Sequence, residues 1–352
     1  MAVYKDEERG TWYCSLYYTD WTGARKLKKK RGFATKRDAL AWERKFLEMQ
    51  QADLKMSFGS FWEIYKGDMQ VRLRENTMQT KKHIVETKLL PYFENLMMDE
   101  ITAVTIRKWQ NKLLQEGYKE TYLKTVNNQL SAMFNYAVNY YGLKSNPCRK
   151  AGSIGKKHAD EMQFWTKEEF DEFIKGVSDK PQSYASFMVL FWTGMREGEL
   201  LALTYENVDF DKHTISIKQS YQRLNGRDVI TAPKTPRSVR VISIPTFLVE
   251  VLKKYTDSLY GLQPKDRIFP FTKYFFSREM MRGCKSTGVK KIRVHDLRHS
   301  HATMLIEMGI PILEVRDRLG HERVETTLNL YGHIYPDKQK ELADKLDNAY
   351  KK

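Results

Sequence analysis

Residues 193–203 read TGMREGELLAL, and this stretch decides how the carboxyl-terminal half of the chain folds. Gly194 marks a break before a helical turn. Arg196 and Glu199 lie three positions apart in that turn, so they share one face, and Glu199 can orient the Arg196 guanidinium. Taken alone, the two residues are more often an ordinary surface ion pair, because such pairs are common and weak.

A second cluster, residues 295–303, reads HDLRHSHAT. His295 and Arg298 again share a helical face, and the combination suits a phosphate, since Arg supplies a bidentate fork and His donates or shuttles a proton. His295 and His299 also have the spacing of a helical zinc pair. The zinc protease pattern, however, has Glu after its first His, and Arg298 would set a fixed positive charge against the ion. We therefore expect no metal, and the roles of His299 and His301 stay open.

A third cluster, residues 319–333, reads LGHERVETTLNLYGH. His321 follows a helix that Gly320 should end, and Tyr331 comes ten residues later on a short helix. An isolated Tyr is usually a packing residue, so the specificity of the pattern lies in the combination of clusters.

The segments between these clusters are predicted from their periodicity. We expect helices over 166–177 and 184–205. Residues 213–245 read as three short strands with Asn225-Gly226 as a tight hairpin turn, and Lys234 falls near the second turn.

In chain order the set resembles the active site of the tyrosine recombinase (phage integrase) family. The chain also resembles the integrases of temperate phages and of conjugative transposons of Gram-positive bacteria. The resemblance covers roughly residues 160 to 335. The matching residues are Arg196, Lys234, His295, Arg298, His321 and Tyr331.

That resemblance implies a site-specific recombinase, or integrase, that cleaves and rejoins DNA and so integrates and excises a mobile element. Tyr331 attacks a scissile phosphate to give a 3′-phosphotyrosine link and a free 5′-hydroxyl. Arg196 and Arg298 stabilise the developing charge, and His295 helps Tyr331 to ionise. In the same scheme Lys234, or a neighbour such as Arg237, protonates the leaving oxygen, His321 hydrogen-bonds a nonbridging oxygen, and Glu199 stands behind Arg196. No cofactor is implied.

Composition agrees with a DNA-binding protein. The chain has 352 residues, which favours several domains, and its 60 Lys and Arg against 44 Asp and Glu give a net charge of +16 and favour a polyanionic partner. Cys14, Cys148 and Cys284 form no CxxC pair, which argues against a disulfide framework. No stretch approaches the ~20 apolar residues of a membrane span. We expect a cytoplasmic, nucleoid-associated protein of a bacterial host.

The fold class predicted is multidomain α+β. Residues 1–55 should form a three-stranded sheet with one helix, which Thr35 and Asp38 cap. This segment resembles the arm-type DNA-binding domain of integrases. Its basic run is predicted to contact phosphates, and the alternative is a solvated edge strand that uses Lys against aggregation. The run consists of Arg25, Lys26, Lys28, Lys29, Lys30 and Arg31.

Residues 56–150 should form an all-helical core-binding domain, with Lys81, Lys82 and Lys124 as candidate phosphate contacts, although most such clusters are merely solvated. A basic linker over 145–157 should separate it from a mixed, mainly helical catalytic domain at 151–352, with a small antiparallel sheet. Residues 336–352 carry a narrow apolar stripe on a predicted tail helix, which docks either on its own domain or on a neighbouring protomer.

The partners implied are double-stranded DNA, with core-type and arm-type attachment sites, and further copies of the chain in a homotetramer on DNA. The resemblance also leaves room for an excisionase or a host DNA-bending protein. Two rival functions remain at this point. One is a type IB topoisomerase-like enzyme, and the other is a DNA-binding regulator without catalysis.

Overall fold

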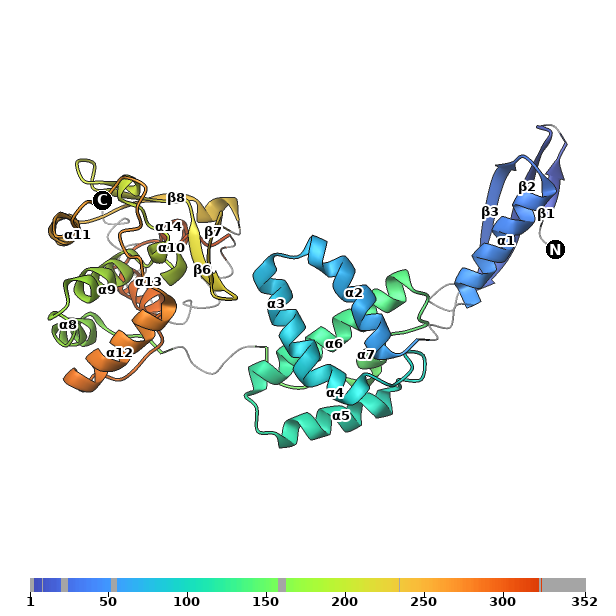
Figure 1. Cartoon of the computed structure of the whole chain (residues 1–352), viewed down its shortest axis with the longest axis horizontal. Coiled ribbons are helices and arrows are strands. Elements are labelled where there is room, and N and C mark those ends of the chain that lie inside the picture. The colour runs from blue at the N-terminus through green and yellow to red at the C-terminus, as the bar shows by residue number, and fades with distance from the viewer. Residues whose placement is uncertain are drawn as a thin grey trace, which may run out of the picture. The chain divides into compact units, whose positions relative to one another are not determined.

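The computed structural model describes residues 3–7, 9–19, 25–51, 56–157, 163–233, 235–322 and 324. The chain divides into two compact units, Met1–Asp160 and Glu161–Lys352. Figure 1 shows the strands and helix of the amino-terminal segment, the helices that follow it, and the mixed second unit. The division falls ten residues after the position expected from the sequence.

The first segment is a three-stranded antiparallel sheet covered by one helix. Strands β1 (Val3–Asp6), β2 (Thr11–Thr19) and β3 (Arg25–Phe33) pair in the order β1-β2-β3, and helix α1 (Lys36–Gln51) packs on the sheet. Cys14 and Leu16 on β2 are buried together with Ala39 on α1. The Thr35 hydroxyl accepts from the Asp38 amide at 3.1 Å, which confirms the predicted cap.

The rest of the first unit is helical, as predicted. Its elements are α2 (Phe58–Arg72), α3 (Glu75–Ile84), the π-helical turn η1 (Val85–Leu89), α4 (Leu90–Phe93), α5 (Ala103–Gln115), α6 (Glu120–Tyr140) and α7 (Pro147–Ala151). Fully buried aromatic side chains fill its centre, among them Phe58, Trp62, Trp109 and Phe134.

The basic stretch predicted as a linker is partly built into this helical unit. Within α7, Cys148 and Ala151 are buried, and Ile154 packs on the same core. A Cβ at Gly155 would come within 2.0 Å of the Glu120 carbonyl oxygen, so the chain must pass close to α6 at a residue without a side chain.

The second unit is mixed. Its helices are α8 (Lys167–Lys175), α9 (Pro181–Thr193), α10 (Glu197–Leu201), the 3₁₀ turns η2 (Tyr205–Asn207) and η3 (Pro236–Ser238), α11 (Thr246–Asp257), α12 (Lys273–Thr287), α13 (Asp296–Glu307) and α14 (Ile312–Leu319). Its strands are β4 (Val208–Asp209), β5 (Thr214–Ile217), β6 (Ser220–Leu224), β7 (Arg227–Thr231) and β8 (Arg240–Ser243).

The helical run predicted over 184–205 is two helices, which separate at the break that Gly194 marks in the sequence. Helix α9 ends at Thr193, Gly194 takes the left-handed conformation at φ +64°, and α10 starts at Glu197. A Cβ at Gly194 would lie 2.6 Å from Cδ2 of His301 on α13. The break therefore lets the end of α9 approach α13 closely.

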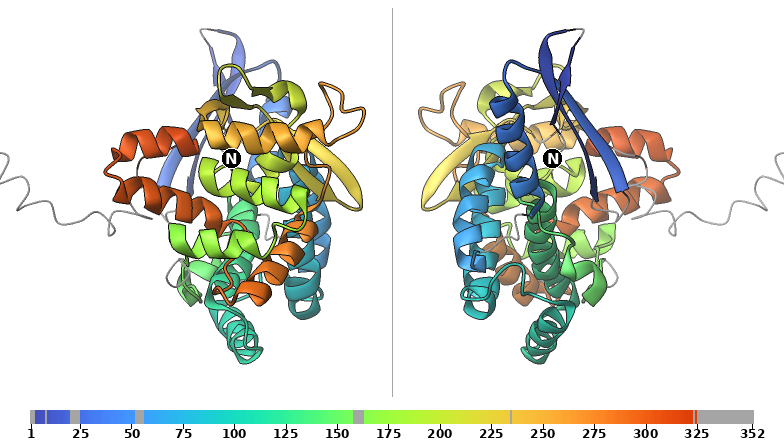
Figure 2. Two further views of the ribbon diagram at one scale, coloured as in Figure 1. Left: turned by 90° about the vertical axis from the view of Figure 1, so that its left-hand side faces the viewer. Right: turned by 90° about the vertical axis from the view of Figure 1, so that its right-hand side faces the viewer.

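The strand prediction for 213–245 needs a similar correction. The segment holds four strands rather than three, and they lie in two sheets, β4-β5-β8 and β6-β7. Asn225 and Gly226 both have positive φ between the paired ends of β6 and β7, which confirms the hairpin turn. Figure 2 shows α13 and α14, coloured orange to red, side by side.

Within the described ranges, none of the helices combines the length and the apolar composition needed to cross a bilayer.

Candidate active site

The site is organised around the carboxyl-terminal end of α14, where three consecutive carbonyls each accept from a different arginine. Arg240 Nε donates to the Arg318 carbonyl at 2.8 Å, Arg298 Nη2 to that of Leu319 at 2.7 Å, and Arg196 Nη2 to that of Gly320 at 3.5 Å. The last carbonyls of a helix lack intrahelical donors and carry its negative dipole end. They therefore form a natural anchor for guanidinium groups.

Glu199 holds two of these arginines together. Its Oε1 accepts from Arg196 Nη1 at 2.8 Å and from Arg240 Nη1 at 3.1 Å. Its Oε2 accepts from the Arg196 amide at 2.8 Å and from Arg240 Nη2 at 2.9 Å. Burial by itself would raise the pKa of Glu199, but the hydrogen bonds and charges of Arg240 and Arg196 outweigh it and hold the pKa below its usual range. Glu199 thus stays a carboxylate.

Arg298 joins α13 to the other two segments. It is 3% exposed, and its Nη1 donates to the Gly194 carbonyl at 2.8 Å while its Nη2 reaches Leu319. The Gly194 break, the HDLRH helix and the end of α14 therefore meet at one guanidinium. This geometry brings together the three motifs that are separate in the sequence.

The histidines beside these arginines have lowered pKa values. His295 is exposed at the start of α13, and its ring lies across that of His299, with centroids 5.4 Å apart and planes at 87°. Partial withdrawal from water, the His299 ring and the Arg298 charge lower the pKa of His295 from its ordinary value. Burial and the charges of Arg298 and Arg196 lower the pKa of His321 to about 3. Neutral imidazoles can act as proton acceptors.

His301 has a structural role, which the sequence did not determine. It is 1% exposed, and its Nε2 accepts from Arg318 Nε at 3.0 Å. Burial, followed by the charges of Arg318 and Arg298, lowers the pKa of His301 to about 3. His301 is therefore a packing residue that fixes Arg318, and it is not offered to a substrate.

Two predicted residues, Lys234 and Tyr331, lie outside the described residues, as do the short helix at 326–331 and the tail at 336–352. The described residues next to Lys234 nevertheless lie near the site. A Cβ at Gly320 would come within 3.0 Å of the Arg237 carbonyl oxygen and of the Arg240 side chain. Arg237 itself is half exposed, 4.0 Å from Asp317.

Sequence reasoning missed Arg240 and Arg318. On β8, Arg240 alternates with Val239 and Val241, which are 51% and 65% exposed, and is in phase with the buried Ile242. Side chains of a strand alternate between its two faces, so Arg240 can be assigned to the buried face only if that face is recognisable. Here both faces carry apolar residues, and the sequence does not show which one is buried. The signal was present but ambiguous.

No group of three or more His, Cys, Asp or Glu side chains in the described part of the chain is arranged to hold a metal ion.

The basic run on β3 divides between the two faces of the sheet. The outer cations are Arg25, Lys29 and Arg31, and the inner cations are Lys26, Lys28 and Lys30. Arg25 lies over the Tyr17 ring at 4.7 Å and Lys29 over that of Tyr13 at 4.6 Å, whereas Lys30 lies over Trp42 of α1 at 5.3 Å. All six residues are exposed.

The candidate phosphate contacts of the helical segment differ among themselves. Lys81 is 8% exposed, and its ammonium donates to Tyr65 at 3.0 Å and to Gln129 at 2.7 Å. It points into the helical segment and is not placed to contact a phosphate. Lys82 is exposed, 3.9 Å from Glu86. Lys124 donates to Ser153 at 2.7 Å.

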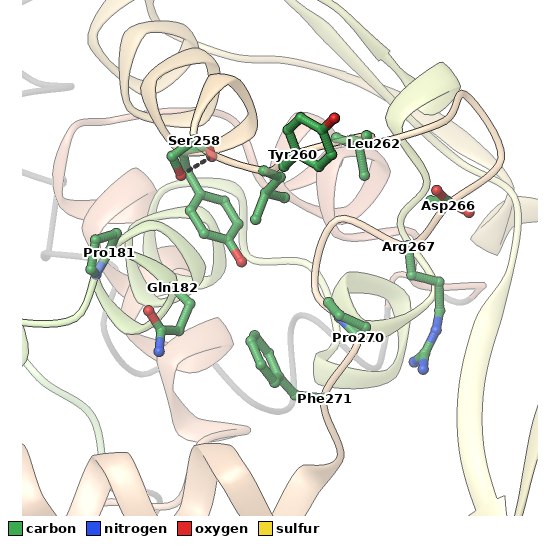
Figure 3. A pocket seen from close by; sticks show the side chains of 12 residues that line it. Pro181, Gln182, Ser258, Tyr260, Leu262, Asp266, Arg267, Pro270 and Phe271 are labelled. Carbon is green, nitrogen blue, oxygen red and sulfur yellow. Dashed lines mark hydrogen bonds between the residues drawn. The ribbon is translucent and has the colours of Figure 1, made fainter.

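A cavity of about 580 Å³ lies between the end of α11 and the start of α9 (Figure 3). Tyr255, Tyr260 and Phe271 line it, together with Arg267. None of its lining residues belongs to the predicted catalytic set. This hollow is therefore separate from the residues of the candidate site.

Three family descriptions match the chain. The phage integrase family matches residues 163–338, an arm DNA-binding domain matches residues 2–49, and an N-terminal SAM-like domain of phage integrases matches residues 57–114. The ICEBs1 integrase of Bacillus subtilis is 32% identical over 336 residues, which cover 90% of each chain.

Solved structures share the fold. The Tn1549 transposon integrase in complex with transposon right end DNA matches with a TM-score of 0.70 at 19% identity, over 83% of this chain and 100% of that one. A λ integrase tetramer bound to a Holliday junction matches with a TM-score of 0.60 at 18% identity, over 93% of this chain and 94% of that one.

The family match and the relative define the class of protein, a DNA recombinase. The chain belongs to the phage integrase family, and it is a tyrosine recombinase of the kind carried by mobile elements.

Proposed function

We propose that this recombinase cleaves DNA through Tyr331, with Arg196, Lys234, His295, Arg298 and His321 as its catalytic residues and Glu199 as the positioning residue for Arg196. The observation that carries the proposal is the convergence of Arg196 and Arg298 on the end of α14, directly before His321. Two guanidinium groups held by backbone carbonyls are preorganised for the nonbridging oxygens of one phosphate.

The chemistry follows from these groups. The Tyr331 oxygen forms a bond to phosphorus, its proton passes to His295, and the bond from phosphorus to the 5′-oxygen breaks. Lys234 supplies the proton that the departing 5′-oxygen needs. A phosphate ester replaces a phosphate ester, so the bond energy is retained for the reverse attack by a 5′-hydroxyl. A free Tyr has a pKa of about 10, which is why neighbouring cations and a neutral imidazole matter.

The substrate in this proposal is double-stranded DNA with core-type and arm-type attachment sites, met in the bacterial cytoplasm. The outer cations of β3, together with Lys82 and Lys124, are proposed to contact phosphates, and the inner cations contribute charge at longer range. Four copies would assemble on two duplexes, with the tail after Pro336 docking on the same or a neighbouring protomer. An excisionase or a host DNA-bending protein would set the direction.

Covalent capture tests the proposal. A nicked suicide duplex that carries the element's own attachment site should become linked to the wild-type protein. Tyr331→Phe should bind this duplex with nearly unchanged affinity and form no adduct, because only the nucleophilic oxygen is removed. An adduct with the variant would reject Tyr331 as nucleophile. Exchange of strands between two such duplexes distinguishes a recombinase from a nicking and resealing topoisomerase.

A further inference from the structure

Arg240 is a buried arginine whose donors point at the segments that carry the proposed catalytic residues. Its side chain is 7% exposed. It donates to both oxygens of Glu199, to the Arg318 carbonyl at 2.8 Å and to the Ser238 carbonyl at 3.0 Å. One side chain on β8 thus bonds to α10, to the end of α14 and to the turn that follows position 234.

The contact with Glu199 is the one that bears on chemistry. An ionised carboxylate offers about four acceptor positions. Four donors fill them here, two from Arg196 and two from Arg240. Without Arg240, half of these bonds would be lost, and the carboxylate could rotate away from the guanidinium of Arg196, which is 35% exposed and faces the surface.

The opposing explanation is that Arg240 merely staples the domain together. Arg318 provides a comparison, because it also joins several elements and is also withdrawn from water. It donates to His301 at 3.0 Å, to the Ser243 carbonyl at 3.0 Å and to the Trp192 carbonyl at 3.1 Å. These side-chain bonds do not involve Glu199 or Arg196. Replacing each arginine in turn therefore distinguishes a positioning role in cleavage from a purely structural role.

We propose that Arg240 is a positioning residue for DNA cleavage, which acts through Glu199 to hold the Arg196 guanidinium against the nonbridging oxygens of the scissile phosphate. The inference rests on the proposed function, in which Arg196 binds that phosphate. Arg240 is not proposed to contact DNA, because four of its five N–H groups bond within the protein.

The test compares two nicked duplexes that differ only at the scissile phosphate. One carries the ordinary phosphate, and the other a methylphosphonate, in which a methyl group replaces one nonbridging oxygen and removes the negative charge. A neutral group depends less on guanidinium stabilisation. Adduct formation is measured in single turnover with saturating protein for wild type, Arg240→Met, Arg240→Lys, Arg318→Met and Arg196→Met, alongside the melting temperature and DNA affinity of each.

On the ordinary phosphate, Arg240→Met should slow cleavage roughly 10- to 100-fold with DNA affinity unchanged, as expected for loss of a group that orients a ligand-binding side chain. Arg240→Lys should fall between it and wild type, because a point charge replaces a bidentate fork. On the methylphosphonate, both variants should approach wild type, and Arg196→Met should do the same. Arg318→Met should lower the melting temperature and slow both substrates by the same factor.

If Arg240→Met and Arg240→Lys slow adduct formation equally on both substrates, the proposal is overturned, and Arg240 has only a structural role. Rescue by a 5′-phosphorothiolate instead, whose sulfur leaves without a proton, would also overturn it, because Arg240 would then serve the leaving-group side of the reaction. If the methylphosphonate does not rescue Arg196→Met, Arg196 does not stabilise the charge of the scissile phosphate. That result contradicts the proposed function, whereas the two outcomes above contradict only the role of Arg240. Should Arg240→Met not fold, Arg240→Lys carries the comparison.

Discussion

Replacing Glu199 by Gln should weaken both the fold and the reaction, because two arginines depend on its charge. The side chain is 2% exposed and accepts four hydrogen bonds of 2.8 to 3.1 Å. In the Glu199→Gln variant one carboxylate oxygen is replaced by an amide nitrogen, which donates and so opposes the N–H groups of Arg196 and Arg240. Arg240 is then left buried beside a second guanidinium with no carboxylate between them.

Breaking a buried ion pair by removing one partner costs about 3 to 5 kcal/mol. Arg196 is 35% exposed and regains some hydration, so the lower figure of about 3 kcal/mol applies here. For a unit of this size, each kcal/mol corresponds to about 2 to 4 °C in melting temperature, which gives a fall of roughly 6 to 12 °C. Cleavage should fall roughly 10- to 100-fold at temperatures where the variant is still folded.

Glu279→Gln is the matched control. Glu279 is 1% exposed on α12 and accepts from Lys180 at 2.9 Å, from Ser183 at 2.9 Å and from Arg282 at 2.7 Å. None of these bonds involves the arginines at the end of α14. Calorimetry should show a comparable fall in melting temperature for both variants, while only Glu199→Gln loses cleavage well below its melting transition. Equal cleavage by the two variants, or an unchanged melting temperature for Glu199→Gln, would refute the reasoning.

Four further outcomes are expected. Changing the three outer cations of β3 to Gln should reduce the slope of log affinity against log salt concentration for arm-site binding by roughly 0.9 per lost phosphate contact. The same change at the three inner cations should reduce this slope less. Filter-binding titrations would measure both slopes, and equal losses would favour a general electrostatic role. The pKa of His301, about 3, lies below the 6.5 of an unfolded His. The contribution of neutral His301 to the free energy of unfolding is therefore complete above about pH 6.5. It is lost as the pH falls, and the free energy of unfolding is lower by about 2 to 3 kcal/mol at pH 4.5. His301→Gln should therefore narrow the difference in melting temperature between pH 7 and pH 4.5, and an unchanged difference would place the titration elsewhere. Arg196→Lys should bind DNA but form the covalent adduct slowly, because a point charge replaces a bidentate fork. Finally, cleavage by the wild-type protein should continue in EDTA. Loss of cleavage in EDTA that zinc restores would support the metal hypothesis.

Local features were predictable from the sequence because their partners lie within a few residues. The Thr35 cap, the Asn225-Gly226 turn, the left-handed Gly320 and the pairing of Arg196 with Glu199 all depend on contacts over one to four positions. The three-stranded sheet with its helix and the all-helical segment follow from the period of their apolar residues. The class of protein came instead from the resemblance of the three motifs to the phage integrase family, which the family match confirms.

Other features depended on contacts between distant segments. Arg196 meets Gly320 across 124 positions, Arg298 meets Gly194 across 104, and Arg240 meets Glu199 across 41. No local pattern reports such distances, so the shared anchor at the end of α14 and the part played by Arg240 became visible only in three dimensions. Lys81 makes the same point in reverse. Its polar neighbours in sequence suggested a surface, but Gln129, 48 positions away, takes its ammonium into the helical core. Charge and periodicity determine which residues can serve the chemistry, whereas burial and long-range hydrogen bonds determine which of them are held in place to do so.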